Sequence, residues 1–269
     1  MGVPYAEVIG DPIAHSKSPL IHTYWLRQMR LVGDYRAVRV RPGELAAYFA
    51  ERRADPDWRG CNVTMPHKET VAQHVDSLDP PSRRIGAVNT VVRHHGDFLT
   101  GTNTDWQGVN LSLFDTHVTG KKVVLIGAGG AARAAVENLR LAKPSYLTIL
   151  NRSEDKGRPL LVSAGLNGGT GPVAGAPSAD LLINASPLGM SGQPPLTVEL
   201  SGLPIDATVF DMVYDPIETP LIAEARRRRL KAVDGLTMLV WQASMAFTHF
   251  FREPPPNADS PELRELLTQ

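Results

Sequence analysis

Short apolar runs alternate with amphipathic stretches through most of the 269-residue chain. Apolar runs of about four to eight residues are typical of buried strands, and apolar residues at helical spacing are typical of helices that cover a sheet. In the first half this pattern predicts strands at Ala6–Gly10, Tyr35–Val40, Gly60–Thr64 and Ala87–Arg93, and helices at Ser18–Leu31, Gly43–Arg53 and His67–Val75. Ser18 before Pro19 predicts a helix N-cap followed by proline at the first helical position.

The second half opens with a β-branched run at Lys121–Ile126 that stops at a glycine-rich turn. A helix at Ala131–Leu141 and a strand at Ser145–Leu150 complete a βαβ unit, which starts a doubly wound parallel sheet. The same pattern predicts further strands at Leu181–Asn184 and Val209–Met212, and helices at Asp105–Leu113, Pro220–Arg229 and Met238–Phe250. Residues 165–177 are rich in Gly, Pro and Ala and predict a loop.

The alternation of strands and helices indicates an α/β protein of two domains. The last long helix is apolar on more than one face, so we expect it to be buried and to return to the first domain. The predicted domains are therefore residues 1–104 with 236–269, which are discontinuous in sequence, and residues 105–235.

The composition narrows the function classes. The 28 basic and 28 acidic residues balance, so no overall field recruits nucleic acid or an anionic membrane. The run Arg226–Arg229 fits a solvated helix end. Cys61 is the single cysteine, which excludes an internal disulfide and predicts a small buried apolar residue.

No signal-peptide pattern or apolar run of about twenty residues is visible, so we expect a cytoplasmic protein without a membrane partner. The histidines His15, His22 and His67 lack a third ligand at metal-binding spacing, so no metal site is expected.

The glycine-rich turn predicts a dinucleotide site. Small residues after a strand let the backbone approach a pyrophosphate, and the following helix presents free N–H groups. The turn consists of Gly127, Ala128, Gly129, Gly130 and Ala131, and it lies between a predicted strand and a predicted helix, as this motif requires.

The end of the next strand selects the cofactor. Asn151, Arg152 and Ser153, with Lys156 shortly after, offer cations where an NAD site usually has a carboxylate, which favours the 2′-phosphate of NADP. Glu154 and Asp155 add negative charge nearby, and Gly157 and Pro159 disturb the helix expected there, so NAD stays an alternative.

Lys68 and Asp105 stand in the segments Asn62–Lys68 and Gly101–Asp105. An ammonium and a carboxylate beside a nicotinamide site suit carbonyl/alcohol interconversion, in which a side chain moves the proton while hydride moves on the cofactor. Each residue alone has a plainer interpretation, Lys68 as a solvated helix residue and Asp105 as a helix N-cap.

Taken together, the motifs resemble those of the shikimate dehydrogenase family over nearly the whole chain. The motifs that carry the resemblance are residues 10–19 (GDPIAHSKSP), 62–68, 86–90, 103–105, the glycine turn, 151–153, 184–190, 211–214 and 235–242.

The resemblance implies a substrate domain and a Rossmann-like domain with the active cleft between them. It also implies reversible, nicotinamide-dependent reduction of 3-dehydroshikimate to shikimate. We expect the protein to be a monomer or a homodimer. Lys68 and Asp105 match the family's catalytic pair. Ser16 and Ser18 match the hydroxyls that hold the substrate carboxylate. Further matches are substrate contacts at Thr64, Asn89, Tyr214 and Gln242, with Asn62 in the same motif, and the nicotinamide neighbours Met212 and Gly235.

Two residues depart from the family pattern. Trp106 stands where glycine is common, and Thr23 replaces a usual asparagine. These departures leave open quinate or another cyclic hydroxy acid as the substrate. A non-catalytic nucleotide-binding regulator is disfavoured because the chain has both Lys68 and Asp105, and a folate-linked or malate-type dehydrogenase because the Ser16-Lys17-Ser18 turn would have no role.

Overall fold

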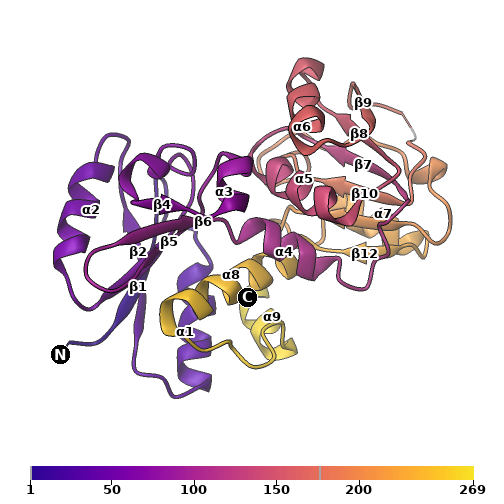
Figure 1. The fold of residues 1–269 in the computed structure, drawn as a ribbon. Coiled ribbons are helices and arrows are strands. Elements are labelled where there is room, and N and C mark those ends of the chain that lie inside the picture. The colour runs from indigo at the N-terminus through magenta and orange to yellow at the C-terminus, as the bar shows by residue number, and fades with distance from the viewer. Residues whose placement is uncertain (1, 176) are drawn as a thin grey trace. The chain divides into compact units, whose positions relative to one another are not determined.

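The strands of the described residues belong to two separate six-stranded sheets (Figure 1). The structure is a computed structural model, and it describes residues 2–175 and 177–269. Met1–Asp105 and Val240–Gln269 form one compact unit, called here the terminal unit, and Trp106–Leu239 form the central unit. The chain leaves the terminal unit at the start of helix α4 (Asp105–Ser112) and re-enters it within helix α8 (Gly235–Phe251).

The sheet of the terminal unit is mixed, with the strand order β2-β1-β3-β5-β6-β4. Strand β1 pairs in parallel with β2 and β3, whereas β5 runs antiparallel to both β3 and β6. The strands span Tyr5–Gly10 (β1), Asp34–Arg39 (β2), Trp58–Val63 (β3), Ser77–Leu78 (β4), Thr90–Arg93 (β5) and Leu99–Thr102 (β6).

Alternate residues of β1 pack on opposite faces of this sheet. Ile9 lies in a cluster with Phe49 of α2, while Val8 lies in a second cluster with Phe250 of α8. This alternation is the two-residue period of a strand buried on both faces. The helices of the unit are α1 (Ser18–Gln28), α2 (Leu45–Ala54), α3 (Pro80–Ile85), the last part of α8, and α9 (Pro261–Thr268), with a 3₁₀ turn at Val71–His74.

The central unit has an entirely parallel sheet in the order β12-β11-β10-β7-β8-β9. Leu125 of β7 packs in a cluster with Leu139 of α5, and the next residue, Ile126, packs in another cluster with Leu221 of α7. Helices therefore cover both faces, as in doubly wound folds. The strands span Lys122–Ile126 (β7), Tyr146–Leu150 (β8), Gly168–Gly171 (β9), Leu181–Asn184 (β10), Thr208–Asp211 (β11) and Lys231–Val233 (β12); the helices are α5 (Gly130–Ala142), α6 (Gly157–Ala164) and α7 (Pro220–Arg227).

The predicted α/β class is confirmed, and three local predictions are wrong. Residues 67–75 form turns and a short 3₁₀ helix rather than an α-helix, and the predicted loop 165–177 contains strand β9. Ser18 is the first residue of α1 rather than its N-cap, which is Lys17, and no side chain caps this helix.

Two expectations about the surface and interior can be checked. Cys61 is fully buried in β3, and burial raises the pKa of its thiol. Arg226 and Arg227 lie exposed at the end of α7, where each pairs with a glutamate. No helix among the described residues is long and apolar enough to cross a membrane.

Candidate active site

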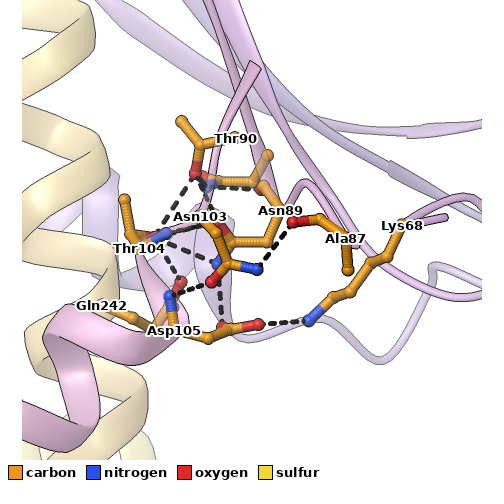
Figure 2. A network of polar contacts seen from close by, with 9 residues as sticks. Lys68, Ala87, Asn89, Thr90, Asn103, Thr104, Asp105 and Gln242 are labelled. Atoms are coloured by element: carbon orange, nitrogen blue, oxygen red, sulfur yellow. Dashed lines mark hydrogen bonds and ion pairs between the residues drawn. The ribbon is translucent and has the colours of Figure 1, made fainter. Parts of the chain in front are cut away.

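Lys68 and Asp105 lie side by side in the terminal unit, with Lys68 Nζ 2.7 Å from Asp105 Oδ2 (Figure 2). Lys68 comes from the turn after β3, and Asp105 is the first residue of α4. The Lys68 side chain keeps 32% of its surface exposed and that of Asp105 keeps 12%, so solvent or a ligand reaches the pair. Lys68 lies in a turn rather than in a helix, and the carboxylate of Asp105 accepts hydrogen bonds from the side chains of Lys68 and Asn89.

Asn89 holds the second oxygen of Asp105. Its Nδ2 donates to Asp105 Oδ1 at 2.8 Å and to Thr104 Oγ1 at 3.1 Å. Its Oδ1 accepts from the Thr104 backbone N–H at 2.6 Å and from Thr90 Oγ1 at 3.0 Å. Because a backbone N–H can only donate, this contact fixes which end of the Asn89 amide faces Asp105.

The loop before Asp105 is braced from both sides. Asn103 Nδ2 donates to the Ala87 carbonyl, and Asn103 Oδ1 accepts from the Asp105 N–H, each at 3.0 Å. Thr104 Oγ1 contacts Gln242 Oε1 at a long 3.4 Å, which brings α8 into the network (Figure 2). The carboxylate is therefore oriented before any ligand binds.

Asn62 also belongs to this network. Its Oδ1 accepts from the Tyr35 hydroxyl at 2.6 Å, and its Nδ2 donates to Thr90 Oγ1 at 2.9 Å and the Asn89 carbonyl at 3.3 Å. Both amide hydrogens are thus used within the unit, which leaves a ligand only the remaining lone pair of Oδ1.

The predicted hydroxyl residues lie at the ends of the same parallel strands. Ser16 and Ser18 follow β1, and the Ser16 hydroxyl accepts from the Ser18 N–H at 3.3 Å. Thr64 follows β3 and donates its N–H to the Ile9 carbonyl at 2.9 Å. The carboxyl ends of neighbouring parallel strands share one edge of a sheet, so these residues belong to the edge that carries Asn62.

The glycine turn of the central unit has the geometry of a phosphate cradle. Gly127 has a φ of +106°, and a Cβ there would lie 2.9 Å from the Ala185 carbonyl oxygen, so this position needs glycine. Gly129 is the N-cap of α5 and Gly130 its first residue; both are exposed, and a Cβ on either would meet nothing within 4 Å. Ala128 and Ala131 complete the turn, and no side chain caps the helix. Free backbone donors under open space fit a pyrophosphate.

The segment after β8 presents cations. Arg152 and Lys156 are exposed, and within the described residues neither forms an ion pair. Asn151 Nδ2 donates to the Ser153 carbonyl at 2.8 Å and closes the turn that carries Arg152. Lys156 ends a 3₁₀ turn at Glu154–Lys156 and lies outside the α-helix, and α6 begins directly after it at Gly157. Pro159 falls in the first turn of α6, where its missing N–H costs nothing. These groups fit a 2′-phosphate.

Met212 and Tyr214 follow β11 in a segment held by Asp211. The Asp211 carboxylate accepts from Asn184 Nδ2, from the Val213 N–H and from the Thr219 hydroxyl, at 2.9, 3.0 and 2.6 Å. Burial raises the pKa of this carboxyl. Tyr214 is exposed, with 36% of its surface accessible.

Gly235 begins α8 against the same segment. A Cβ there would lie 2.4 Å from the Val213 carbonyl oxygen and 2.6 Å from that of Met212. Glycine is therefore required at this position by backbone packing, whatever lies beyond it.

The structure also adds residues that sequence reasoning did not single out. Tyr35, Thr90 and Thr104 connect the predicted residues of the terminal unit, and Asp211 braces the central one. Their signal in the sequence is a polar side chain within a strand, or at its end, that is otherwise apolar, since such a group is buried only when it has partners.

Similar proteins are found along the whole chain. Residues 8–91 match the family model described as the shikimate dehydrogenase substrate binding domain. A protein of Sphingopyxis alaskensis named shikimate dehydrogenase (NADP(+)) is 52% identical over 265 residues, covering 98% of this chain and 97% of that protein.

Solved structures agree with this similarity. The shikimate 5-dehydrogenase of Thermus thermophilus, in complex with NADP(H) and shikimate, matches with a TM-score of 0.86 and 32% identity over 98% of each chain. The ligand-free 5-ketofructose reductase of a Gluconobacter strain matches with a TM-score of 0.91 and 29% identity over 99% of each chain.

Proposed function

Because the chain belongs to the shikimate dehydrogenase family, we propose that it catalyses the reversible, NADP-dependent reduction of 3-dehydroshikimate to shikimate. The reaction converts a ring carbonyl into an alcohol, so it needs a hydride for carbon and a proton for oxygen. It belongs to the oxidoreductases that act on a CH–OH group.

One observation carries the proposal, namely the 2.7 Å contact between Lys68 Nζ and Asp105 Oδ2 at a solvent-accessible position. The two residues stand 37 positions apart in sequence, and Asn89 holds the free oxygen of the carboxylate. A lone surface ion pair would not need this bracing, whereas an acid–base pair does, because proton transfer requires a fixed donor.

Lys68 supplies the proton to the substrate oxygen during reduction and takes it back in the reverse direction. Asp105 orients the ammonium through Oδ2 and can accept a hydrogen bond from a substrate hydroxyl. Gln242, Thr64 and Asn62 lie in the same unit and offer further short polar contacts to the ring hydroxyls, while Ser16 and Ser18 bind the carboxylate. Tyr214, in the central unit, is the further proposed substrate contact.

NADP, when bound, supplies the hydride. The open backbone at Gly129 and Gly130 takes the pyrophosphate, and Arg152 binds the 2′-phosphate with its planar guanidinium. Asn151, Ser153 and Lys156 support that phosphate, and Met212 and Gly235 adjoin the nicotinamide.

A panel of substrates tests the proposal. The purified protein is assayed with shikimate, quinate and, in the reductive direction, 5-ketofructose, each with NADP and with NAD. We expect the highest kcat/KM for shikimate with NADP. A higher kcat/KM for another substrate, or for NAD, would replace that part of the proposal.

Trp106 gives the panel a second purpose, because it directly follows Asp105 where glycine is common in the family. If its indole shapes the space around the substrate ring, Trp106→Gly changes the ratio of kcat/KM between shikimate and quinate by about tenfold. An unchanged ratio would make Trp106 a structural residue only.

A further inference from the structure

Tyr35 is buried in the terminal unit and bonds to Asn62 of the proposed active site, but no part in the reaction has been assigned to it so far. It lies in β2 with 4% of its surface exposed. His22 of α1 stacks on its ring with the centroids 3.9 Å apart and the planes at 8°. This packing holds the phenol in one rotamer, so its hydroxyl points in a fixed direction.

The Tyr35 hydroxyl begins a path of hydrogen bonds that ends at Asp105. It donates to Asn62 Oδ1 at 2.6 Å, and Asn62 Nδ2 donates to Thr90 Oγ1 at 2.9 Å. Thr90 Oγ1 donates to Asn89 Oδ1 at 3.0 Å, and Asn89 Nδ2 donates to Asp105 Oδ1 at 2.8 Å.

Every donor on this path points the same way. The Asn62 Nδ2 also donates to the Asn89 carbonyl at 3.3 Å, and a carbonyl can only accept, so the amide nitrogen faces Asn89 and Thr90. The amide oxygen therefore faces the phenol, which must donate to it. The Thr90 hydroxyl, having accepted from Asn62, is free to give its single hydrogen to Asn89. Hydrogen bonds aligned in one direction polarise one another, which strengthens the last donor of the series.

We propose that Tyr35 is a positioning residue, whose hydroxyl fixes the Asn62 amide and, through Thr90 and Asn89, the carboxylate that orients Lys68. The proposal rests on the proposed function, because the carboxylate is that of the proposed acid–base pair. In this role Tyr35 acts through the groups that hold the reacting atoms, not by contact with substrate or cofactor. Its effect is on how the reacting groups are held.

Without the hydroxyl, Asn62 Oδ1 loses its donor, and the 3.3 Å bond from Nδ2 to the Asn89 carbonyl is then the contact that still opposes turning of the amide. The turned amide would present its oxygen to Thr90, which would then give its hydrogen to Asn62 instead of Asn89. The Thr104 N–H would still hold Asn89, so the network would weaken without collapsing. The expected defect is therefore catalytic rather than a loss of fold.

Tyr35→Phe tests this with Tyr48→Phe as its matched control. The Tyr48 hydroxyl is also buried in the terminal unit and also donates at 2.6 Å, but to Glu7 on a path that does not reach Asp105. We expect Tyr35→Phe to lower kcat about tenfold with the KM for NADP within about twofold, whereas Tyr48→Phe keeps both constants. Unchanged kcat in Tyr35→Phe, or an equal loss in Tyr48→Phe, would overturn the proposal.

A double-mutant cycle sharpens the test. Thr90→Val removes the middle of the path, so its loss and that of Tyr35→Phe should not multiply in the double variant. Thr90→Ser, which keeps the hydroxyl, should restore most of the activity lost in Thr90→Val. Losses that multiply fully would mean that the two residues act independently.

A readout without turnover separates this proposal from the proposed function. In Tyr35→Phe the side-chain amide resonances of Asn62 and Asn89 should both shift by NMR, and in Tyr48→Phe neither should. A stationary Asn89 resonance would overturn the path even in an active enzyme. If the wild-type protein fails to oxidise shikimate, the proposed function falls while the NMR result still decides the role of Tyr35.

Discussion

The proposed sites of the two units differ in whether side chains or backbone groups are offered to the ligand. The proposed site of the terminal unit is built from side chains that hold one another, with Asn89 between Thr104 and Asp105 and Asn62 between Tyr35 and Thr90. The proposed cofactor site of the central unit offers backbone N–H groups at a turn where side chains are nearly absent.

This difference follows from what each ligand requires. A small ring with several hydroxyls is distinguished by donors and acceptors at fixed angles, so the side chains must be oriented in advance. A pyrophosphate is recognised by charge and close approach, so the backbone must be left uncovered. Substitutions in the terminal unit should therefore damage turnover, and substitutions in the central unit should damage cofactor binding.

The largest effect is expected at Lys68. Lys68→Ala removes the proton donor, so kcat should fall about 10³-fold while the KM for NADP stays within about twofold. Steady-state kinetics in both directions measure this. Lys231→Ala is the control. It removes a different lysine–aspartate pair, Lys231–Asp115 of the central unit, and should keep kcat. Near-normal turnover in Lys68→Ala would refute the assigned role.

Gly129→Val should produce the opposite pattern. Its φ of −88° and ψ of −163° suit valine, and a Cβ meets no protein atom, so stability should fall by no more than about 1 kcal/mol. The side chain occupies the space proposed for phosphate, so the KM for NADP should rise on the order of 100-fold. Unaltered cofactor binding by titration calorimetry would place the pyrophosphate elsewhere.

A third prediction concerns the pH dependence of stability, and it rests on His22 of the terminal unit. Burial lowers the pKa of His22 to about 3, whereas an unfolded histidine titrates near about 6.5. As pH falls below that value the unfolded chain takes up a proton that the folded one does not. Stability is thus lost progressively between about pH 6.5 and 3, with about 2 kcal/mol gone by pH 5.

His22→Phe keeps an aromatic ring against Tyr35 and removes the titration. Urea unfolding of both proteins at pH 8 and pH 5 measures the difference, because the other histidines contribute equally to each. The wild-type protein should lose about 2 kcal/mol more than the variant. Parallel losses in the two proteins would show that the pKa of His22 in the folded chain is not lowered by burial.

The smallest effect is expected at Arg152. Arg152→Ala should raise the KM for NADP about tenfold and leave that for NAD unchanged, because only NADP has the 2′-phosphate. Arg227→Ala, another exposed arginine of the central unit, should change neither. An equal loss with both cofactors would instead indicate a contact common to them.

Much of the fold could be predicted from the sequence where the type of side chain indicates burial or a turn. The β-branched residues of β7 and the glycines after them indicate a βαβ unit, and the bounds of β10 are as predicted. Strand β9 could not be found in this way, because Gly168–Gly171 has almost no side chains to form a pattern. It is glycine-rich because neighbours approach closely, and a Cβ on Gly168 would overlap the carbonyl of Leu147.

The site shows a similar division. The contact between Lys68 and Asp105 was predictable, because the resemblance to a family joins motifs that are distant in sequence. The proposed role of Tyr35 was not predictable, since tyrosine is common in strands and its partner Asn62 lies 27 residues away. Hydrogen-bond direction depends on the arrangement of several strands in three dimensions, and local residue pattern does not encode it.

Modification of Cys61 can be used to measure local unfolding of this protein. The thiol is fully covered in β3 beside Asn62, and burial raises its pKa, so the folded chain presents no thiolate that could attack a disulfide reagent. We expect labelling to require an opening of the terminal unit that uncovers β3. The rate of modification by a chromogenic disulfide therefore reports opening of the strand that carries Asn62, with one signal per molecule and no engineered probe.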